Sequence, residues 1–427
     1  MKVLLLNQDW FADELRSLGF EVRTAGHEFA RHLEHTVNLP MLHIDRLIQM
    51  IPGNFVPDCI VALDNSAPIA FTGLDETNIP TIFYGVDAHH HVALHRYLNE
   101  IFDYSFTAQK DYIPLYEEWG QQVEWMPLWA SRHIDPSYNQ KEHGAVFIGT
   151  LNKDLNPERV AFFDALREKV PVLCTTGCFW EYFPLSEIVI NQTVKLDLNF
   201  RVFEAMMSGA LLLTEHSQNG LLELFQDGAH LVTYQKNNVD QAAELIQYYI
   251  DHPEEARRIG KAGRDLILEK HTPLQRAKRL AEVIRTIKKK QSSRKFQAMA
   301  INHLSLARSA KEQDPAVKLL ALTATLKSFE YSLEYREPCD AAVAAHLMIA
   351  AHDYDKLSHG RTGYELLKRF NKQYSDQRLL SIGALRSALN FGERAYAETI
   401  REELGIESLS TAYSESDKIM RTLLDQL

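Results

Sequence analysis

The sequence predicts two α/β domains of the Rossmann type, each built on a parallel sheet, followed by an all-helical domain. Three observations support this fold class. Short apolar runs alternate with amphipathic stretches from the N-terminus to about residue 270, a polar stretch with two prolines interrupts them at 127–144, and no strand-like run of consequence follows Ser293. We therefore expect domains at residues 1–133, 144–290 and 295–427.

The first domain begins with a strand–helix–strand unit. An apolar run at Val3–Leu6 precedes an amphipathic stretch at Phe11–Leu18, and Gly19 separates that stretch from a second β-like run at Phe20–Thr24. Further strands are expected at Asp58–Leu63, Thr81–Tyr84, Tyr104–Ala108 and Val123–Met126. Short runs that are apolar throughout are typical of parallel strands buried on both faces.

The second domain repeats this pattern. Strands are expected from Ala145 (AVFIGT), and then at 170–174, 188–191, 210–214 and 230–233. Long helices are expected at Asp240–Asp251, Pro253–Lys270 and Pro273–Lys290.

The C-terminal region has apolar residues at helical spacing, which predicts a stack of antiparallel helices. The segments LLALTATLKS (319–328) and LLSIGALRSA (379–388) are faintly alike, which suggests tetratricopeptide-like repeats although no repeat signature is intact. A surface of stacked helices suits a protein or polymer partner, and we expect residues 295–427 to recruit one.

Composition excludes several classes of function. The chain carries 57 acidic and 46 basic residues, a formal net charge of −11, which argues against a general nucleic-acid or anionic-membrane binder. The cysteines have no disulfide-type spacing, so we expect a reducing, cytoplasmic location. The N-terminus fits a first strand better than a signal peptide, and no apolar run is long enough to predict a membrane span.

The most informative segment is KLDLNFRVFEAMMSGALLLT, residues 195–214. It predicts a loop, a helix from about Asn199 to Met207, a stop at Gly209 and a strand. This order directs the helix N-terminus toward the carboxyl edge of the sheet, where ligands of open α/β sheets bind. The amides of Asn199, Phe200 and Arg201, together with the helix dipole, would favour an anion such as a diphosphate there.

Charged residues in this segment suggest more of the chemistry. Arg201 and Lys195 would place fixed positive charge beside the anion. Glu204 lies one turn beyond Arg201, and a buried carboxylate there can accept hydrogen bonds from the two hydroxyls of a ribose. The alternative is an ordinary surface helix on which Arg201 and Glu204 form an i,i+3 ion pair.

Two consecutive motifs carry a resemblance to a known family. NFRVFEAMMSGALLLTE (199–215) and GLLELFQDGAHLVTY (220–234) resemble the donor-binding half of group 1 glycosyltransferases of the GT-B fold, in particular the spore-maturation or spore-coat branch. The residues that fit the two patterns are Glu204, Ala205, Met206, Ser208 and Gly209, then Gly220, Glu223 and Gly228. The resemblance implies that Glu204 binds ribose and that Glu223 belongs to the donor site.

The resemblance extends more weakly over residues 1 to about 290. FIGTLNKD (147–154) looks like the strand and loop that open the donor domain, which implies phosphate contacts at Gly149 and Lys153. It also implies that the helix at 273–290 crosses back to the first, acceptor-side domain. Many group 1 enzymes carry a glutamate eight residues before the helix glutamate, whereas this chain has Leu196 there, beside Asp197.

Histidines cluster just after a predicted strand of the first domain. We expect Asp87 and His89 at the cleft edge, where they would bind sugar or acceptor and where a histidine can act as a base. His91 and His95 have the i,i+4 spacing of half a zinc site, and a solvated His-rich loop is the third interpretation. The family needs no metal, so neither a metal nor another cofactor is expected.

The reaction implied is glycosyl transfer from a nucleotide-sugar donor to an acceptor hydroxyl, with Arg201, Lys195 and the helix amides stabilising the leaving diphosphate. By resemblance, the acceptor is a bacterial surface polysaccharide or protein. Two alternatives remain open: a catalytically degenerate scaffold, favoured by Leu196, and a nucleotide-sugar epimerase. Four tryptophans fit packing better than sugar stacking: Trp10, Trp125, Trp129 and Trp180.

Overall fold

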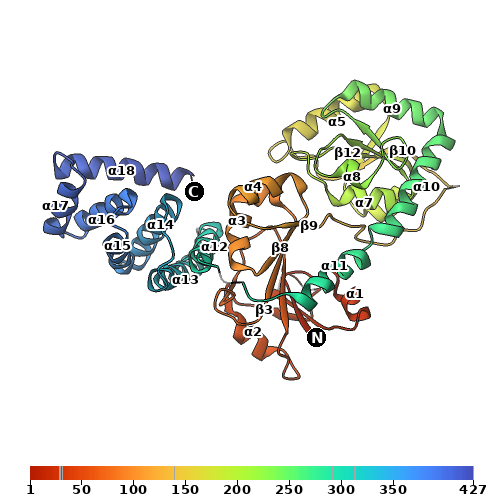
Figure 1. Ribbon diagram of the computed structural model, residues 1–427. Helices are drawn as coiled ribbons and strands as arrows, with labels where there is room; N and C mark the ends of the chain where they lie inside the picture. Colours follow the sequence, from red (N-terminus) through yellow and green to blue (C-terminus); the bar gives the residue numbers. More distant parts are fainter. Residues whose placement is uncertain (28–29, 31, 139, 291, 312–313, 427) are drawn as a thin grey trace.

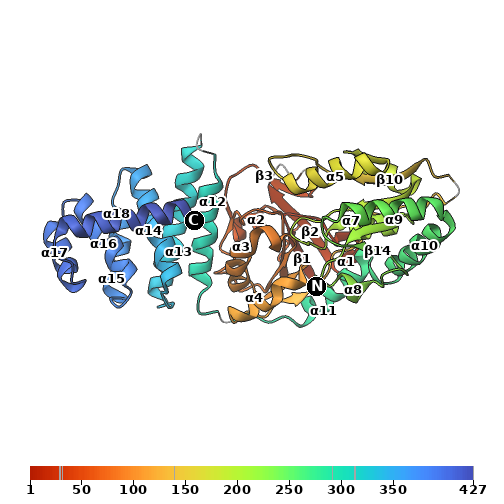
Figure 2. The ribbon, with the colours of Figure 1, turned by 90° about the horizontal axis from the view of Figure 1, so that it is seen from above.

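The computed structural model describes residues 1–27, 30, 32–138, 140–290, 292–311 and 314–426. Two α/β domains and a helical domain follow one another along the molecule, with the N-terminal α/β domain in the middle (Figures 1 and 2). This arrangement confirms the predicted fold class.

The first domain is built on a seven-stranded parallel sheet with the strand order β3-β2-β1-β5-β7-β8-β9. Its strands are β1 (Lys2–Leu6), β2 (Glu21–His27), β3 (His35–Val37), β5 (Cys59–Leu63), β7 (Thr81–Gly85), β8 (Tyr104–Thr107) and β9 (Glu124–Trp125). The helices are α1 (Ala12–Ser17), α2 (Ile44–Met50), α3 (Ala88–Ile101), the 3-10 helix η1 (Lys110–Tyr112) and α4 (Ile113–Glu118). A small sheet of β4 (Leu42–His43) and β6 (Phe71–Thr72) lies apart. Helix α2 and strands β3, β4 and β6 were not expected from the sequence.

The second domain is a five-stranded parallel sheet with the order β11-β10-β12-β13-β14. Its strands are β10 (His143–Ile148), β11 (Val172–Thr175), β12 (Ser186–Asn191), β13 (Leu211–Glu215) and β14 (Val232–Tyr234). Its helices are α5 (Pro157–Lys169), α6 (Phe179–Tyr182), the 3-10 helix η2 (Phe183–Leu185), α7 (Phe200–Met207), α8 (Leu221–Leu224), α9 (Val239–Asp251) and α10 (Pro253–Lys270). Gly209, with φ of 76°, ends α7 in the left-handed conformation that glycine adopts without strain.

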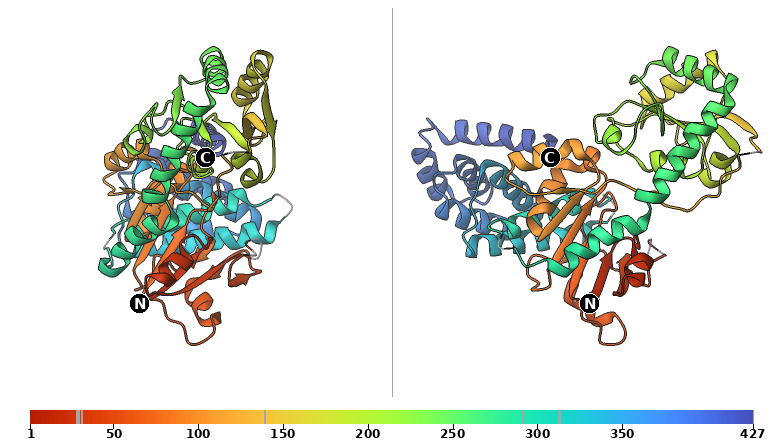
Figure 3. Two further views of the ribbon diagram at one scale, coloured as in Figure 1. Left: turned by 90° about the vertical axis from the view of Figure 1, so that its right-hand side faces the viewer. Right: turned by 45° about the vertical axis from the view of Figure 1, so that its right-hand side comes forward.

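Helix α11 (Pro273–Thr286) leaves the second domain and runs back to the first, where it packs beside α1 (Figures 1 and 3). Its residues Leu280 and Ile284 are buried in the same core as Val3 and Leu5 of β1. Arg276 fastens the helix to the interdomain linker, because its guanidinium donates to the Pro127 carbonyl at 2.6 Å and to the Leu128 carbonyl at 2.8 Å.

The C-terminal domain consists of packed helices: α12 (Lys295–Ser309), α13 (Pro315–Glu334), α14 (Ala341–Ser358), α15 (Thr362–Gln373), α16 (Arg378–Asn390), α17 (Arg394–Glu403) and α18 (Leu409–Gln426). Helices α15 and α18 were not anticipated. Helix α12 packs along α3, and Met299 joins Leu4 and Leu6 on the face of β1 opposite that covered by α11. Asn302 completes this junction, since its side-chain amide exchanges two hydrogen bonds with the backbone of Ile69 at 2.9 and 2.8 Å.

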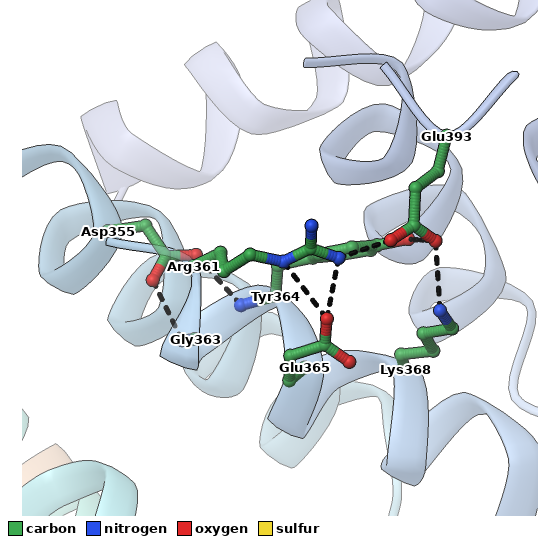
Figure 4. A network of polar contacts seen from close by, with 7 residues as sticks. All are labelled: Asp355, Arg361, Gly363, Tyr364, Glu365, Lys368 and Glu393. Atoms are coloured by element: carbon green, nitrogen blue, oxygen red, sulfur yellow. Dashed lines mark hydrogen bonds and ion pairs between the residues drawn. The ribbon is translucent and has the colours of Figure 1, made fainter. Parts of the chain in front are cut away.

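A polar network fastens α15 to the start of α17 (Figure 4). Glu393 accepts hydrogen bonds from Lys368 Nζ at 2.9 Å and from the Tyr364 hydroxyl at 2.7 Å, and it also pairs with Arg361. These three donors lower the pKa of Glu393 to about 2. Asp355 caps the other end of the network by accepting from the amides of Gly363 and Tyr364, each at 2.8 Å. In the described part of the chain, none of the helices is both long and apolar enough to cross a lipid bilayer.

Candidate functional site

The loop between β12 and α7 lies at the carboxyl edge of the second sheet and has an unusual backbone. Lys195 and Leu196 are consecutive residues with φ of 54° and 59°, a conformation that side chains disfavour. Asp197 holds the turn, because its carboxylate accepts from the Val194 amide at 2.7 Å. The loop delivers the chain to the N-terminus of α7, where Asn199 makes no side-chain cap, so the first amides of the helix are available to a ligand.

Two arginines meet beside this helix end. Arg201 on α7 donates to the Ile148 carbonyl at 2.9 Å and to the Asn191 side chain at 2.7 Å. Arg159 on α5 donates to the side chain and the carbonyl of Gln192, both at 3.0 Å. Both guanidinium groups lie over the ring of Phe147, at 4.7 and 5.6 Å from its centroid.

These two guanidinium groups carry positive charge that no ion pair neutralises, since all the acceptors that the described residues give them are neutral amide and carbonyl oxygens. Burial, and then the nearby charge of Arg159, lower the pKa of Arg201 to about 10. Burial likewise lowers the pKa of Arg159. Two buried cations of this kind, next to a helix N-terminus, form an environment suited to an anion.

Gly149 makes the position of Arg201 possible. A Cβ atom at this residue would lie 2.8 Å from Nη2 of Arg201 and 2.8 Å from Cζ of Phe147, closer than real Cβ contacts. The glycine expected to let a phosphate approach the backbone therefore also gives room to the arginine beside it.

Glu204 faces the linker from α7. Its Oε1 accepts a hydrogen bond from the Ser131 hydroxyl at 2.5 Å, and burial raises its pKa. The surface ion pair between Arg201 and Glu204, one alternative from the sequence, is not among the ion pairs of the described residues, where Arg201 contacts Ile148 and Asn191 instead. The carboxylate is thus half-buried against the interdomain linker.

Polar contacts hold the two α/β domains together across the cleft. Gln109, which follows β8, donates to the Leu198 carbonyl at 3.3 Å and accepts from the Leu198 amide at 3.0 Å. Lys195 Nζ reaches the carbonyl of His89 at 3.1 Å. Glu223 forms an ion pair with Lys110 of the first domain. The predicted donor residues Lys195 and Glu223 therefore also act as interdomain contacts in this structure.

The histidine-rich segment is helical. Residues 88–101 form α3, with a kink at His91, and both His89 and His95 are buried. The interpretation as a solvated loop is wrong for these two residues. His95 and His91 have ring centroids 6.4 Å apart, and His95 Nε2 lies 3.2 Å from Asp64 Oδ2. Within the described ranges, no three side chains of the metal-binding types gather as a metal site would require.

Asp64 organises the start of α3. Its Oδ2 accepts from the amides of Val86 and Asp87, at 2.8 and 3.0 Å. Burial alone would raise the pKa of Asp64, but the hydrogen bond and charge of His95 hold it below its usual range. Asp87 in turn accepts a hydrogen bond from Ser66. This network fixes Asp87, one of the two residues that the sequence placed at the cleft edge.

A cleft of about 250 Å³ opens between the domains at this point, and its lining includes Trp10, Asp87, His89, Asp197 and Asn199. His89 Nδ1 and Asn199 Oδ1 are buried atoms without a hydrogen-bond partner among the described residues. A second cleft, of about 220 Å³, is lined by Arg159, Val194 and Lys195 among others. The loop 194–197 separates the two clefts.

The structure thus brings together most of the predicted residues but not all. Asp87, His89, Asn199 and Phe200 line the first cleft, and Lys195 lines the second. Arg201 and Glu204 lie on α7, and Gly149 is next to the guanidinium of Arg201. Lys153 is exposed on the loop after β10. The ring of Phe200 packs 6.2 Å from Trp10 and 5.1 Å from Trp129, which agrees with packing of both tryptophans at the hinge.

Sequence reasoning missed Arg159 and Gln109. The only local signal for Arg159 is a charged residue next to Val160 and near Phe162, on the buried face of an amphipathic helix. Gln109 carries a weaker signal, as a polar residue directly after a buried parallel strand, where ligand sites of such sheets lie.

Residues 172–282 match a family model described as "Glycosyl transferase-like". None of the curated proteins compared with the chain matches it significantly. Among solved structures, HepE from Anabaena in complex with UDP and glucose is similar with a TM-score of 0.51 at 13% identity, covering 67% of this chain and 99% of HepE. HepE in complex with UDP-glucose gives 0.50 at 12% identity, with 67% and 99% covered. A glycosyltransferase from Rickettsia africae gives 0.49 at 11% identity, with 66% and 97% covered.

These identities show the fold alone. The two α/β domains have the GT-B fold, and the second of them contains a segment that is similar to the glycosyl transferase-like family.

Proposed function

We propose that the protein is a glycosyltransferase that moves a sugar from a nucleotide-sugar donor to an acceptor hydroxyl. The observation that carries this proposal is the juxtaposition of the buried Arg159 and the half-buried Arg201, whose hydrogen-bond acceptors are neutral, beside the uncapped N-terminus of α7. Asp197 acts on both guanidinium groups without forming an ion pair with them, and a diphosphate would supply that direct pairing. The match of residues 172–282 to glycosyl transferase-like proteins supports the same class of ligand.

The main chemical task in this proposal is to stabilise the leaving diphosphate. Negative charge grows on it as the bond to the sugar breaks, so fixed positive groups lower the barrier more than they strengthen ground-state binding. Arg159, Arg201, Lys195 and the amides of Asn199 and Phe200 are the groups available. No resident metal or other cofactor is needed to supply this charge.

Glu204 would bind the ribose of the donor. Among the described residues Ser131 alone donates to this carboxylate, through Oε1, which leaves Oε2 able to accept from a ribose hydroxyl. The raised pKa that burial gives Glu204 does not prevent this role, since the proposed hydrogen bonds favour the ionised form.

His89 is the best candidate for the base that takes the acceptor proton. Burial lowers its pKa, so the imidazole is neutral near physiological pH and can accept a proton. Its buried Nδ1 has no partner among the described residues, and Asp87 lies in the same cleft. The interdomain contacts would exclude water and limit hydrolysis of the donor.

We further propose that the acceptor is a bacterial surface polysaccharide or a surface protein. We also propose that the reaction takes place in the cytoplasm, with a nucleotide sugar as the donor. HepE was crystallised with UDP and glucose and with UDP-glucose, which makes a uridine nucleotide the first donor to test.

The decisive experiment measures binding of UDP, GDP, CDP, CMP, ADP and dTDP by calorimetry and thermal shift. One nucleotide should bind wild type saturably, and Glu204→Ala and Arg159→Gln should each weaken it about 10- to 100-fold, the usual effect of losing a hydrogen bond to a charged group. Arg167→Gln is the matched control, because Arg167 lies on the same helix in an exposed pair with Asp164. No binding by any of the six would contradict the proposal.

A scaffold without catalysis is the second candidate, because Leu196 stands where many group 1 enzymes carry a glutamate. Binding of a nucleotide sugar with no turnover toward any acceptor, and no hydrolysis, would favour it. Formation of an epimeric nucleotide sugar without acceptor would instead identify an epimerase.

A further inference from the structure

A cleft of about 480 Å³ lies at the junction of the N-terminal α/β domain and the helical domain, away from the site described above. Its walls come from the end of α3, the turn after α4, residues 290 and 292–294 before α12, and the starts of α12 and α14. Figures 1 and 2 show α12 beside α3 at this junction. The lining includes Arg96, Glu100, Trp119, Gln121, Ser293 and Gln297.

Two side chains of this cleft have hydrogen-bonding capacity that the protein leaves unused. Gln121 and Gln297 are 4% and 1% exposed, and the Oε1 atom of each is buried without a donor among the described residues. The orientation of both amides is fixed by the acceptors of their nitrogens. Gln121 Nε2 donates to the Arg96 carbonyl at 2.7 Å and to Glu100 at 2.9 Å, and Gln297 Nε2 donates to the Pro338 carbonyl at 2.9 Å.

A buried acceptor without a donor costs free energy, so a ligand whose donors reach these two covered oxygens as the surrounding side chains shift would be favoured. The two oxygens come from different domains, Gln121 from the first α/β domain and Gln297 from α12. A ligand that contacts both would therefore bridge the junction.

The charges in the lining are balanced. Three basic residues and three acidic residues contribute: Arg96, Lys290 and Arg294, and Glu100, Glu118 and Asp340. Arg294 and Asp340 form an ion pair at 2.6 Å. Neither a polyanion nor a polycation is favoured by such a lining.

Aromatic side chains supply the apolar part of the cleft. The Arg96 guanidinium lies 4.7 Å from the centroid of the Trp119 ring, and Tyr97 lines the cleft beside it. The Trp119 ring is partly exposed although Arg96 covers one of its faces, and a lining of aromatic and amide groups suits a ligand that has both apolar faces and hydroxyl groups.

From these contacts we propose that the junction cleft is a binding site for a neutral oligosaccharide. Sugar hydroxyls donate hydrogen bonds without carrying charge, and sugar ring faces pack against aromatic rings. Helix α3 connects this cleft to the proposed active site, since His89 lies in its first turn and Tyr97 lies on the same helix beyond the kink at His91. The site therefore holds a part of a polymeric acceptor that does not react. This role as an acceptor site rests on the proposed function, whereas the binding of an oligosaccharide to the cleft does not.

The test measures binding of maltohexaose, cellohexaose, chitohexaose and mannohexaose to the full chain without nucleotide, by calorimetry and saturation-transfer NMR. At least one should bind saturably, and Trp119→Ala should weaken it about tenfold, in line with the loss of an aromatic contact and of ordered hydrogen bonds. Trp180→Ala is the matched control, because Trp180 of the second domain also lies under an arginine, Arg132, at 4.4 Å.

Ser293→Trp provides a second variant that removes no packed side chain, since Ser293 is exposed at the rim and a bulky group there obstructs the opening. It should abolish binding with the folded state intact. Arg159→Gln should bind the saccharide normally even where it loses the nucleotide, which separates failure of this proposal from failure of the donor site. The proposal is overturned if none of the four saccharides binds, if both cleft variants bind as wild type does, or if only a pool of neutral peptides occupies the cleft.

Discussion

The side-chain amide of Gln109 clamps the backbone of Leu198 from the opposite domain, donating to its carbonyl at 3.3 Å and accepting from its amide at 3.0 Å. Both residues are buried, and Leu198 directly precedes the cap of α7. The N-terminal domain thus helps to fix the loop that presents the proposed diphosphate site.

Replacing Gln109 with leucine should therefore loosen the interdomain contact. The substitution leaves the Leu198 amide buried without an acceptor, which costs about 1–3 kcal/mol. Urea denaturation measures this loss, and small-angle scattering should show a larger radius of gyration. Gln247→Leu, an exposed glutamine on α9, serves as the control. An unchanged radius together with unchanged stability would mean that the clamp is dispensable.

Gly149→Ala should weaken nucleotide binding without unfolding the domain. The added Cβ would lie 2.8 Å from both Nη2 of Arg201 and Cζ of Phe147, so the guanidinium must shift from its two acceptors. Calorimetry with the nucleotide that wild type binds should show a loss of roughly tenfold or more.

The matched control for this glycine is Gly144→Ala, at the other end of the same strand. Its Cβ would meet only the flexible end of Ile250, at 3.0 Å from Cδ1, and should leave nucleotide affinity unchanged. Equal affinities for the two alanine variants would show that Gly149 does not position Arg201.

The fall of the transferase rate at acid pH should reflect protonation of the His89 imidazole. Burial lowers the pKa of this imidazole below its ordinary value of 6.5, so the base form persists to lower pH than for a free histidine. In kcat/KM the rate should fall only below about pH 6.5, and His89→Gln should reduce the rate by about 100-fold or more and remove that fall.

His90→Gln provides the comparison, because His90 is the exposed neighbour on the same helix. This variant should keep the wild-type rate and the wild-type fall of kcat/KM at acid pH. A His89→Gln enzyme with a normal pH profile would exclude His89 as the base.

The junction with the helical domain should lose stability as pH rises. Burial raises the pKa of Glu337 from 4.5 to about 7, although its carboxylate accepts from the amides of Phe296 and Gln297 at 3.1 and 2.9 Å. Burial also raises the pKa of Asp75 to about 7. Because the folded state holds these protons more tightly than the unfolded state, Asp75 and Glu337 contribute stability that is complete below their ordinary pKa values of 3.8 and 4.5. This contribution to the free energy of unfolding is lost as the pH rises toward 7.

Denaturant unfolding between about pH 5 and about pH 8 measures this dependence. Glu337→Gln removes one of the two titrations and should flatten the curve, whereas Glu334→Gln, an exposed position at the end of α13, should not. If the free energy of unfolding of Glu337→Gln depended on pH as steeply as that of wild type, Glu337 would not be one of the titrating groups.

The sheets were predictable from sequence because parallel strands buried on both faces are apolar at every position, as in Cys59–Leu63. Helix α3 was not, because its first turns are rich in histidine. His95 is buried there only because Asp64, far back in the sequence, pairs with it. The residues next to His95 in the sequence do not indicate that Asp64 is its partner.

Some residues of the candidate site could likewise be predicted from local sequence, and others could not. Helix α7, its exposed amides and Gly209 follow from local signals, so the sequence indicates them directly. Arg159 depends on Gln192, which lies 33 residues later, and Gln109 depends on Leu198, 89 residues later. Only the folded chain brings these residues together, which is why sequence reasoning missed the second guanidinium and the interdomain clamp.

The two faces of β1 are completed by helices that are translated long after it. Leu280 and Ile284 of α11 cover the side of Val3 and Leu5, and Met299 of α12 covers the side of Leu4 and Leu6. At the usual rate of synthesis, the N-terminal sheet waits for these helices for roughly ten seconds or more after its last strand emerges. The nascent chain therefore passes through a stage in which apolar surface is exposed on both sides of its first sheet. This stage requires protection by a chaperone. A chain that ended in the interdomain linker would lack α11 and α12, so its first sheet would stay exposed.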